Sequence, residues 1–454
     1  MITRRTSRRT RWRRVDRTHD REILQLAVPA FLALVAEPLF LLADAAIVGH
    51  LGTPQLAALG IASAVLATLV SLCIFLAYGT TASVARAVGA GQPQVALAQG
   101  IAGLWLATAI GLVLSIMTVP AASWIVGLFD PSPAVSELAL TYLRIALLGV
   151  TPMLLVLAAT GVLRGLQDTR TPLVVAVAGN LINIATNLVL VYGIGDFDGY
   201  GIAGSAVGTL IAQVLSAIAL VTVVVIAARR QQTRLGPRVL AIVHAGRAGV
   251  PLLVRTLLLR ASLLVMTYAA ARLGDADLAA MQLALTIWTF LAFVLDAVAI
   301  AAQAITGRYL GAGDAAGVRA VTRRMQQWGW CSGLATGVLL AALSPALGPL
   351  FTGDEDVRAL LTSVLLVAAL AQPLAGIVFV LDGVLIGAGD AVFLAWAQLG
   401  SIALFAPAVY LLQTGAAEPG LVWLWIAFAG LFMGVRAATL LARARGDRWM
   451  RLGA

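Results

Sequence analysis

Carboxyl, amide and hydroxyl side chains occur at a few positions inside long apolar runs of this sequence. Asp44 lies in the first run, Asn183 and Asn187 lie in a later one, and Ser205 lies in the next. Residues i and i+4 share one face of a helix, so Asn187, Asn183 and, one turn further, Asn180 form a polar stripe. Asp44 carries the only full charge of this set. The amides and the hydroxyl would orient its carboxylate or complete a coordination shell.

Asp44 also has a simpler interpretation, as the ion-pair partner of Arg144 at a similar depth in a neighbouring run. A buried, neutralised pair of this kind satisfies both groups and needs no transport role. We favour a functional role, because charged residues at bilayer depth are costly and usually face the interior of a protein.

Charges of both signs mark the second half of the chain. Arg255 and Asp382 occur at one matching depth, and Arg260 and Asp296 occur at another. These depths predict two ion pairs, Arg255–Asp382 and Arg260–Asp296. We favour a structural or gating role for them over binding of substrate or protons.

Two further polar residues are candidates for a substrate cleft or for gating. Glu37 lies mid-way along the first run, just before Pro38, where a carboxylate facing a cleft would attract cationic substrate. Gln303 is the second, although a hydrogen bond between packed helices also accounts for it. The three histidines are scattered without ligand spacing, so we expect no metal site other than Na⁺ at Asp44 as an alternative to a proton.

The composition places these residues in a membrane. Hydrophobic residues make up 61% of the 454 residues and charged residues only 11%, whereas soluble proteins carry about 25% charged residues. A helix needs about 20 apolar residues to cross the hydrocarbon layer. The runs that meet this length predict twelve helices, at about 23–49, 55–85, 95–127, 137–163, 171–194, 200–228, 247–272, 278–307, 322–350, 358–388, 391–413 and 420–443.

Arginine distribution gives the orientation of these helices. With the N-terminus inside, the outer loops contain only two arginines, Arg272 and Arg358, and are otherwise acidic. The inner segments contain nearly all the others, and such a bias marks the cytoplasmic side. We therefore expect a multi-pass protein of the inner (cytoplasmic) membrane with both termini in the cytoplasm. The arginine-rich arm is expected to lie against anionic lipid rather than nucleic acid.

The chain repeats itself at a single offset of 222 residues. The matched segments are Val28-Pro29 with Val250-Pro251, Leu51-Gly52 with Leu273-Gly274, Gly89-Ala90-Gly91 with Gly311-Ala312-Gly313, and Gly161-Val162-Leu163 with Gly383-Val384-Leu385. Each half holds six helices, an even number, so both halves enter the membrane in the same direction. We predict an all-α membrane protein of two parallel six-helix bundles, related by a pseudo-twofold axis along the membrane normal.

The chain is expected to divide into five parts. They are a cytoplasmic arginine-rich arm at 1–22, an N-terminal six-helix bundle at 23–228, a cytoplasmic linker at 229–246, a C-terminal six-helix bundle at 247–443 and a cytoplasmic tail at 444–454.

Three segments resemble signatures of the MATE (multidrug and toxic compound extrusion) family, and within it the DinF-like branch. The first contains Pro29, Pro38-Leu39, Asp44 and Val48-Gly49-His50-Leu51-Gly52. The others are Gly161-Val162-Leu163-Arg164-Gly165-Leu166-Gln167-Asp168-Thr169-Arg170-Thr171-Pro172 and Ala301-Ala302-Gln303 with Gly307-Arg308-Tyr309-Leu310-Gly311-Ala312-Gly313-Asp314. The resemblance spans all twelve predicted helices and includes the duplication.

The resemblance implies a secondary active antiporter that works by alternating access. It would export organic cations or amphipathic drugs in exchange for H⁺ or Na⁺, without a cofactor, and as a monomer. It also implies that Asp44, Asn180, Asn183, Asn187 and Ser205 form the cation site of the N-terminal half. The departure from the family pattern that matters is Asn187, because members of this kind commonly have a carboxylate at this position; Phe40 also stands where some relatives have a tyrosine. A relay that needs two carboxylates in this half would be incomplete.

A flippase for lipid-linked or other large amphipathic precursors is the alternative, since related folds move such molecules. Proteins of that kind often have fourteen helices and a cationic central cavity; this chain has twelve predicted helices, but Arg255 and Arg260 keep the alternative open. An enzyme is not expected, because paired catalytic carboxylates, metal ligands and Ser/His sets are not visible in the sequence.

Overall fold

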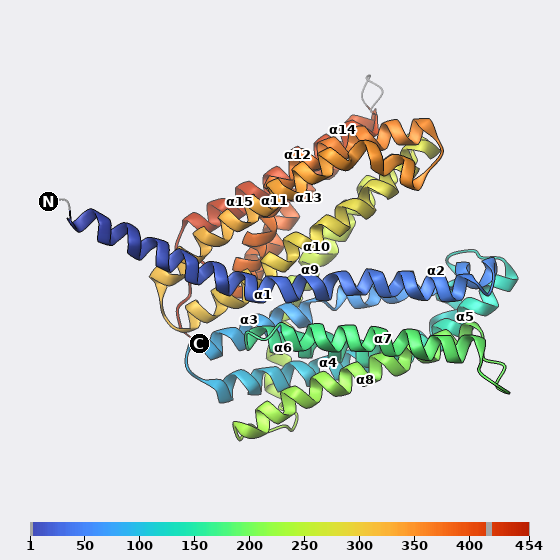
Figure 1. Ribbon diagram of the computed structural model, residues 1–454, viewed down its shortest axis with the longest axis horizontal. Helices are drawn as coiled ribbons and strands as arrows, with labels where there is room; N and C mark the ends of the chain where they lie inside the picture. The colour runs from blue at the N-terminus through green and yellow to red at the C-terminus, as the bar shows by residue number, and fades with distance from the viewer. Residues whose placement is uncertain (1–2, 415–419, 454) are drawn as a thin grey trace. The chain divides into compact units, whose positions relative to one another are not determined.

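The computed structural model describes residues 3–414 and 420–453, with side chains from residue 19 onward (Figure 1). Apart from one isolated bridge between Ile194 and Phe197, the regular elements of these residues are helical. They are α1 (Thr3–Gly49), α2 (Thr53–Leu72), α3 (Phe75–Gly89), α4 (Pro93–Gly127), α5 (Pro133–Leu148), α6 (Val150–Gly165), α7 (Arg170–Tyr192), α8 (Ile202–Arg230), α9 (Val239–Ala271), α10 (Asp275–Gly311), α11 (Ala315–Phe351), α12 (Glu355–Gly387), α13 (Ala391–Thr414), α14 (Leu421–Ile426), the π-helix η1 (Ala427–Phe432) and α15 (Met433–Arg445).

These elements form the twelve predicted spans. Within the described residues, eleven helices are long and apolar enough to cross a membrane, and α5 with α6 makes a twelfth that bends by 46°. The break lies at Gly149, and Pro152 just beyond it has no N–H to donate to the carbonyl of Leu148. Two more spans are composite, because α2 and α3 form one and α14, η1 and α15 form another. The all-α, twelve-helix prediction is confirmed.

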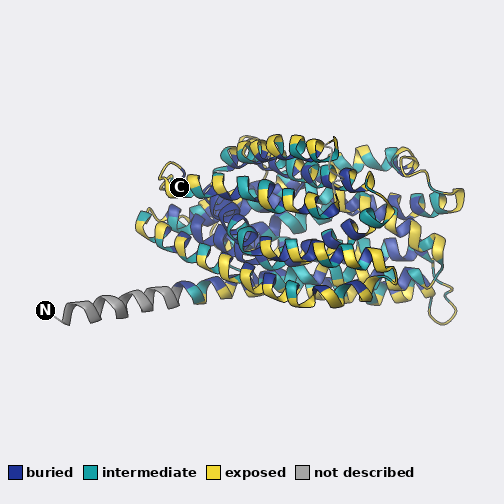
Figure 2. Ribbon diagram, turned by 90° about the horizontal axis from the view of Figure 1, so that it is seen from above, coloured by how far each residue is buried: buried dark blue, intermediate teal, exposed yellow. Residues whose placement is uncertain are grey.

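Burial follows the pattern of a protein surrounded by lipid. Figure 2 shows exposed residues along the outer faces of the helices and buried residues between the helices. Large apolar side chains are among the exposed ones, including Leu370 at 83% and Ile116 at 71%. Water would penalise such a surface, whereas hydrocarbon does not.

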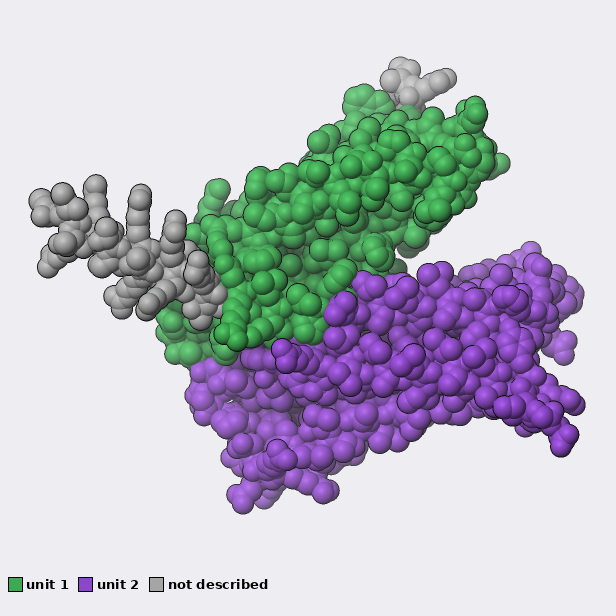
Figure 3. Space-filling model, in the orientation of Figure 1, with its two compact units in different colours: residues 1–31, 251–454 green, residues 32–250 purple. Residues whose placement is uncertain are grey.

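The chain forms two compact units, coloured separately in Figure 3. Unit 1 comprises residues 1–31 and 251–454, and unit 2 comprises residues 32–250. Helices α1 and α9 each contribute to both units. The predicted bundles began at residues 23 and 247. The units of the structure differ from this prediction because the first part of α1 belongs with the C-terminal helices.

Ion pairs between α1 and the C-terminal helices explain this assignment. Asp20 accepts hydrogen bonds from Arg324 Nε at 2.6 Å and Arg324 Nη2 at 2.7 Å on α11. Trp328 Nε1 donates to the same carboxylate at 2.8 Å, and Glu22 pairs with Arg308 on α10. A paired arginine fork of this kind fixes position as well as charge. These contacts hold this part of α1 against α10 and α11.

The repeat is visible in how the helices pack within each unit. Four glycines lie against the backbone of a neighbouring helix, so that an added Cβ would meet backbone atoms at 3.0 Å or less. Their contacts are Gly161 on Ala77, Gly165 on Thr81, Gly383 on Ala299 and Gly387 on Gln303. The first two pairs join α3 to α6, and the other two join α10 to α12 at the same offset of 222. Only glycine allows helices to approach this closely.

Candidate functional site

Asp44 is the centre of a buried hydrogen-bonded cluster in unit 2. Its Oδ1 atom accepts from Asn187 Nδ2 at 2.7 Å and from Ser205 Oγ at 2.7 Å. Asn187 Nδ2 also lies 3.0 Å from Asn183 Oδ1, and Asn183 Nδ2 donates to Thr209 Oγ1 at 3.0 Å. Asp44, Asn183, Asn187 and Ser205 each have 3% or less of their surface exposed. The structure therefore brings together four of the five predicted residues, from α1, α7 and α8.

A fourth helix contributes a residue that sequence reasoning missed. Tyr142 on α5 is 2% exposed, and its hydroxyl hydrogen bonds Asp44 while also contacting Ser205 and Thr209. A tyrosine in an apolar helix gives no sequence signal of its own. Thr209 lies four residues after Ser205 on α8, so the two hydroxyls share one face of the helix. This spacing could have predicted Thr209 as a member of the site.

Asn180 occupies a different place from the rest of the predicted set. Its Nδ2 donates to the backbone carbonyl of Ala36 at 2.9 Å and so joins α7 to α1. Ala36 lies about two turns before Asp44 along α1. This contact is a packing hydrogen bond between the two helices. Asn180 remains a predicted site residue only through its place on the polar stripe.

The alternative partner of Asp44 is not found. Arg144 is exposed on α5, and the ion pairs in the described part of the chain do not include one with Asp44. The side chains that hydrogen bond Asp44 are all neutral. A carboxylate held in this way is not neutralised by the protein itself.

One acceptor in the cluster lacks a donor. Asn187 Oδ1 is buried, and no donor in the described residues reaches it. The oxygen packs against Gly208 on α8, and only a glycine leaves room for it there, because a Cβ at that position would meet this oxygen. Buried acceptors in native proteins are nearly always satisfied, and a bound ion is one way to satisfy them. Carboxylate, amide and hydroxyl oxygens are the ligands that hard cations prefer.

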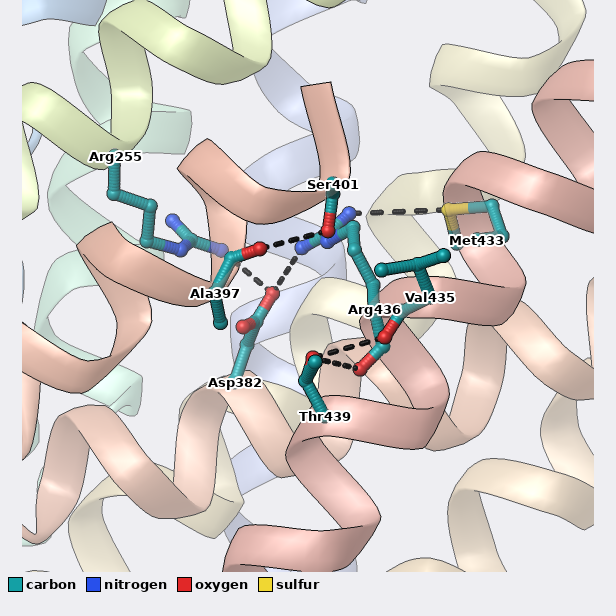
Figure 4. A network of polar contacts seen from close by, with 8 residues as sticks. All are labelled: Arg255, Asp382, Ala397, Ser401, Met433, Val435, Arg436 and Thr439. Atoms are coloured by element: carbon teal, nitrogen blue, oxygen red, sulfur yellow. Dashed lines mark hydrogen bonds and ion pairs between the residues drawn. The ribbon is translucent and has the colours of Figure 1, made fainter. Parts of the chain in front are cut away.

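The second polar site is a cluster of opposite charges in unit 1 (Figure 4). Asp382 on α12 accepts from Arg255 Nη2 at 2.6 Å and from Arg436 Nη2 at 2.5 Å, both on Oδ2. All three residues are buried, with exposures of 6%, 8% and 5%. Arg436 also lies over the ring of Phe432, 5.7 Å from its centroid. The predicted Arg255–Asp382 pair is confirmed, and sequence reasoning missed Arg436.

The predicted Arg260–Asp296 pair was wrong. Arg260 is exposed on α9, and it takes part in none of the ion pairs among the described residues. Asp296 instead acts electrostatically on Arg436. Equal depth along two helices does not fix which of their faces meet.

The remaining two candidates lie apart from both clusters. Glu37 is exposed on α1 in unit 2. Gln303 is buried on α10, and its backbone carbonyl lies against Gly387 in the close contact with α12. Clusters of three or more His, Cys, Asp or Glu side chains able to hold a metal are not found in the part of the chain that was described.

Comparisons with known proteins agree with the repeat. A profile of the MatE family matches residues 29–189 and again residues 251–411, which are the same segment displaced by 222 residues. The chain is 31% identical over 440 residues to Protein DETOXIFICATION 44, chloroplastic, of Arabidopsis thaliana, covering 91% of this chain and 79% of that protein. It is 29% identical over 387 residues to DNA damage-inducible protein F of Escherichia coli (strain K12), covering 81% of each.

Solved structures show the same fold. The crystal structure of MATE in the bent conformation superposes with a TM-score of 0.85 at 21% identity, covering 94% of this chain and 95% of that one. These relatives do not favour the flippase alternative.

Proposed function

Because this chain belongs to the MatE family of multidrug and toxic compound efflux transporters, we propose that it is a secondary active antiporter of the inner membrane. It exports organic cations or amphipathic drugs in exchange for H⁺ or Na⁺, by alternating access. We further propose that it acts as a monomer with both termini in the cytoplasm.

The observation that carries this proposal is the buried Asp44 carboxylate, which has neutral donors and no arginine partner. An unpaired charge in a medium of low polarity is expensive. A proton or one monovalent cation would leave the cluster neutral. The coupling ion therefore supplies the positive charge that the protein lacks at this point.

Asn187 fits this single-charge scheme better than a second carboxylate would. Its amide donates to Asp44 and so stabilises the ionised form. Its oxygen, which lacks a donor in the described residues, packs against Gly208 of α8. Two buried carboxylates here would repel each other and require two positive charges. We infer that one positive charge is taken up at this site in each cycle.

Loss or gain of that charge would change the packing of α1, α7 and α8, because Asp44 holds them together through Asn187 and Ser205. In the proposed cycle, substrate binds from the cytoplasm and leaves outside, and ion binding at Asp44 resets the protein. The cluster of Arg255, Asp382 and Arg436 carries its own counter-charges, so we assign it a structural or gating role.

Efflux in everted vesicles tests the role of Asp44. We expect Asp44→Asn to abolish gradient-driven uptake of a cationic dye while the protein is made and inserted at the normal level. Arg144→Gln is the matched control, since this arginine is exposed and does not pair with Asp44. Uptake by the Asp44→Asn variant at the wild-type rate would overturn the assignment.

Separate gradients identify the coupling ion. Proteoliposomes are given a pH gradient without Na⁺, and then a Na⁺ gradient at equal pH. Uptake under only one of these conditions names the ion. If neither gradient drives uptake by active protein, antiport is refuted.

A further inference from the structure

A cavity opens at the end of unit 1 where α13 begins and α15 ends. It has a volume of about 490 Å³. Its walls are formed by Phe393 of α13, by Thr439, Ala442 and Arg443 of α15, and by residues 446–448 of the segment that follows α15. Both helices belong to spans that are long and apolar enough to cross a membrane. Their ends therefore mark the boundary between the hydrocarbon layer and the lipid headgroups.

The guanidinium of Arg443 is held at the wall of this cavity. Its Nε atom donates to Asp390 Oδ2 at 2.7 Å, and its Cζ atom lies 4.8 Å from the centroid of the Phe393 ring. Asp390 directly precedes α13, so these contacts also tie the end of α15 to the start of α13. The bond to Asp390 uses the Nε–H group, and a guanidinium has four more N–H donors on its two Nη atoms. An arginine held in this way needs little further ordering to bind the oxygens of a phosphate group.

Arg448 supplies a positive charge that the other residues of the wall do not balance. Arg443 pairs with Asp390. Asp447, the acidic residue among those that line the cavity, pairs with Arg319 of α11 at 2.9 Å. Arg448 is exposed, and the ion pairs among the described residues do not include it. The cavity wall therefore has one surplus positive charge.

The segment after α15 holds Arg448 in place. The next residue, Trp449, is buried with 2% of its surface exposed. The backbone N–H of Gly453 donates to the carbonyl of Leu310 on α10 at 3.0 Å. A side chain on an anchored segment loses less conformational freedom on binding than one on a loose segment, so more of its interaction energy remains as affinity.

An apolar strip leads away from the cavity along α13. Val392, Trp396 and Leu399 recur at intervals of four and three residues, so they share one face of the helix. All three are exposed. Trp396 lies about 8 Å along the helix axis from the start of α13, at a depth where tryptophan is enriched in membrane proteins. A cationic cavity beside an apolar strip matches a molecule with an anionic head and apolar chains.

We propose that this cavity binds the headgroup of an anionic phospholipid of the surrounding membrane. The phosphodiester accepts hydrogen bonds from Arg443 and Arg448, and its single negative charge balances the surplus positive charge. An acyl chain follows α13 along Trp396. A zwitterionic phospholipid brings an ammonium group of its own and so leaves the surplus in place. The inference goes beyond the proposed function, because this lipid is a bound constituent of the protein and not its cargo.

Native mass spectrometry of the full chain in detergent micelles tests the site, because it separates protein with one bound lipid from protein with none. Delipidated protein is titrated with dioleoyl phosphatidylglycerol and with dioleoyl phosphatidylcholine, which have the same chains. We expect phosphatidylglycerol to bind about fivefold better, the factor that one arginine near the surface adds to binding of an anionic lipid. Arg448→Gln is expected to remove this preference. Arg448→Lys keeps the charge and is expected to retain most of it.

Two further variants separate a built site from a diffuse basic surface. Arg445→Gln removes the same charge from an exposed arginine that is not among the residues lining the cavity, and it is expected to leave binding unchanged. Ala442→Trp keeps every charge but fills the cavity, and it is expected to weaken binding of phosphatidylglycerol. The unfolding temperature of each variant without lipid shows whether it is folded.

Competition with sn-glycerol 3-phosphate distinguishes a lipid headgroup from free phosphate. This probe has the phosphate and glycerol without the chains, and we expect it not to displace phosphatidylglycerol at equal concentration. Displacement would show that the cavity binds soluble phosphates and would overturn the lipid assignment. Wild-type binding of phosphatidylglycerol by folded Arg448→Gln or Ala442→Trp would overturn the site itself, as would an equal loss of binding in Arg445→Gln and Arg448→Gln.

Discussion

Replacing Asp382 by asparagine tests the charge balance of the buried cluster in unit 1. The carboxylate takes one hydrogen bond from Arg255 at 2.6 Å and one from Arg436 at 2.5 Å, and both arginines are at least 92% buried. An amide keeps the shape of the side chain but removes its charge. Two buried guanidiniums then face the single negative charge of Asp296. Removing one partner of a buried pair costs about 3–5 kcal/mol, and we expect a loss of stability in this range.

The free energy of unfolding in mixed micelles measures this loss, and Asp44→Asn provides the comparison. Both substitutions remove one buried carboxylate from a helix. Asp44 has only neutral partners, so its replacement leaves no positive charge behind. We therefore expect a smaller loss for Asp44→Asn, about 1–2 kcal/mol, which is the size of weakened hydrogen bonds to a charged group.

A double substitution checks that stranded charge is the cause. Arg255→Met with Asp382→Leu removes one charge of each sign and leaves Arg436 with Asp296. Apolar replacement of a buried pair is often neutral or stabilising, so we expect the double variant to recover most of the loss. A cost of less than about 1 kcal/mol for Asp382→Asn, or a double variant as unstable as the single one, would show that no charge is stranded by the substitution.

Two further predictions concern helix packing and the start of α1. Gly383→Ala would place a Cβ within 2.3 Å of the Ala299 carbonyl oxygen, and we expect a loss of about 1–3 kcal/mol in the free energy of unfolding. Gly434→Ala is the control, because nothing lies within 4 Å of its added Cβ; equal effects of the two would contradict the close contact. Asp20→Asn and Arg324→Gln are each expected to cost about 1 kcal/mol, because the pair is partly exposed. In a double-mutant cycle their effects are expected to overlap, and simple additivity would show that the two residues do not interact in the protein.

The architecture was predictable because lipid imposes strict rules on a sequence. A span needs a long apolar run, and such runs can be counted directly in the sequence. The offset of 222 residues was also readable, since Gly161 and Gly383 serve the same backbone contact in the two halves. What the runs could not show is that α1 is shared between units. The contacts that join this part of α1 to α10 and α11 come from Asp20 and Glu22, two ordinary charges in the N-terminal half of a long helix.

The candidate site was predictable where it followed helical periodicity. Asn183 and Asn187 share a face of α7, and Asp44 was the one carboxylate in reach of them. Tyr142 was missed because an aromatic residue in an apolar helix is normally part of the core. The predicted partner of Arg260, Asp296, was wrong for a related reason. Depth gives one coordinate of a residue, and the rotation of each helix decides which charges meet.

Ion release by the purified transporter tests the role of Asp44 most directly. Substrate is added to the protein in weakly buffered, Na⁺-free detergent solution, and the released protons are measured; the experiment is repeated with ²²Na⁺ bound beforehand. The wild type is expected to release one of the two ions when substrate binds, and Asp44→Asn is expected to release neither while remaining folded. Release of the same ion in the same amount by Asp44→Asn would contradict the account.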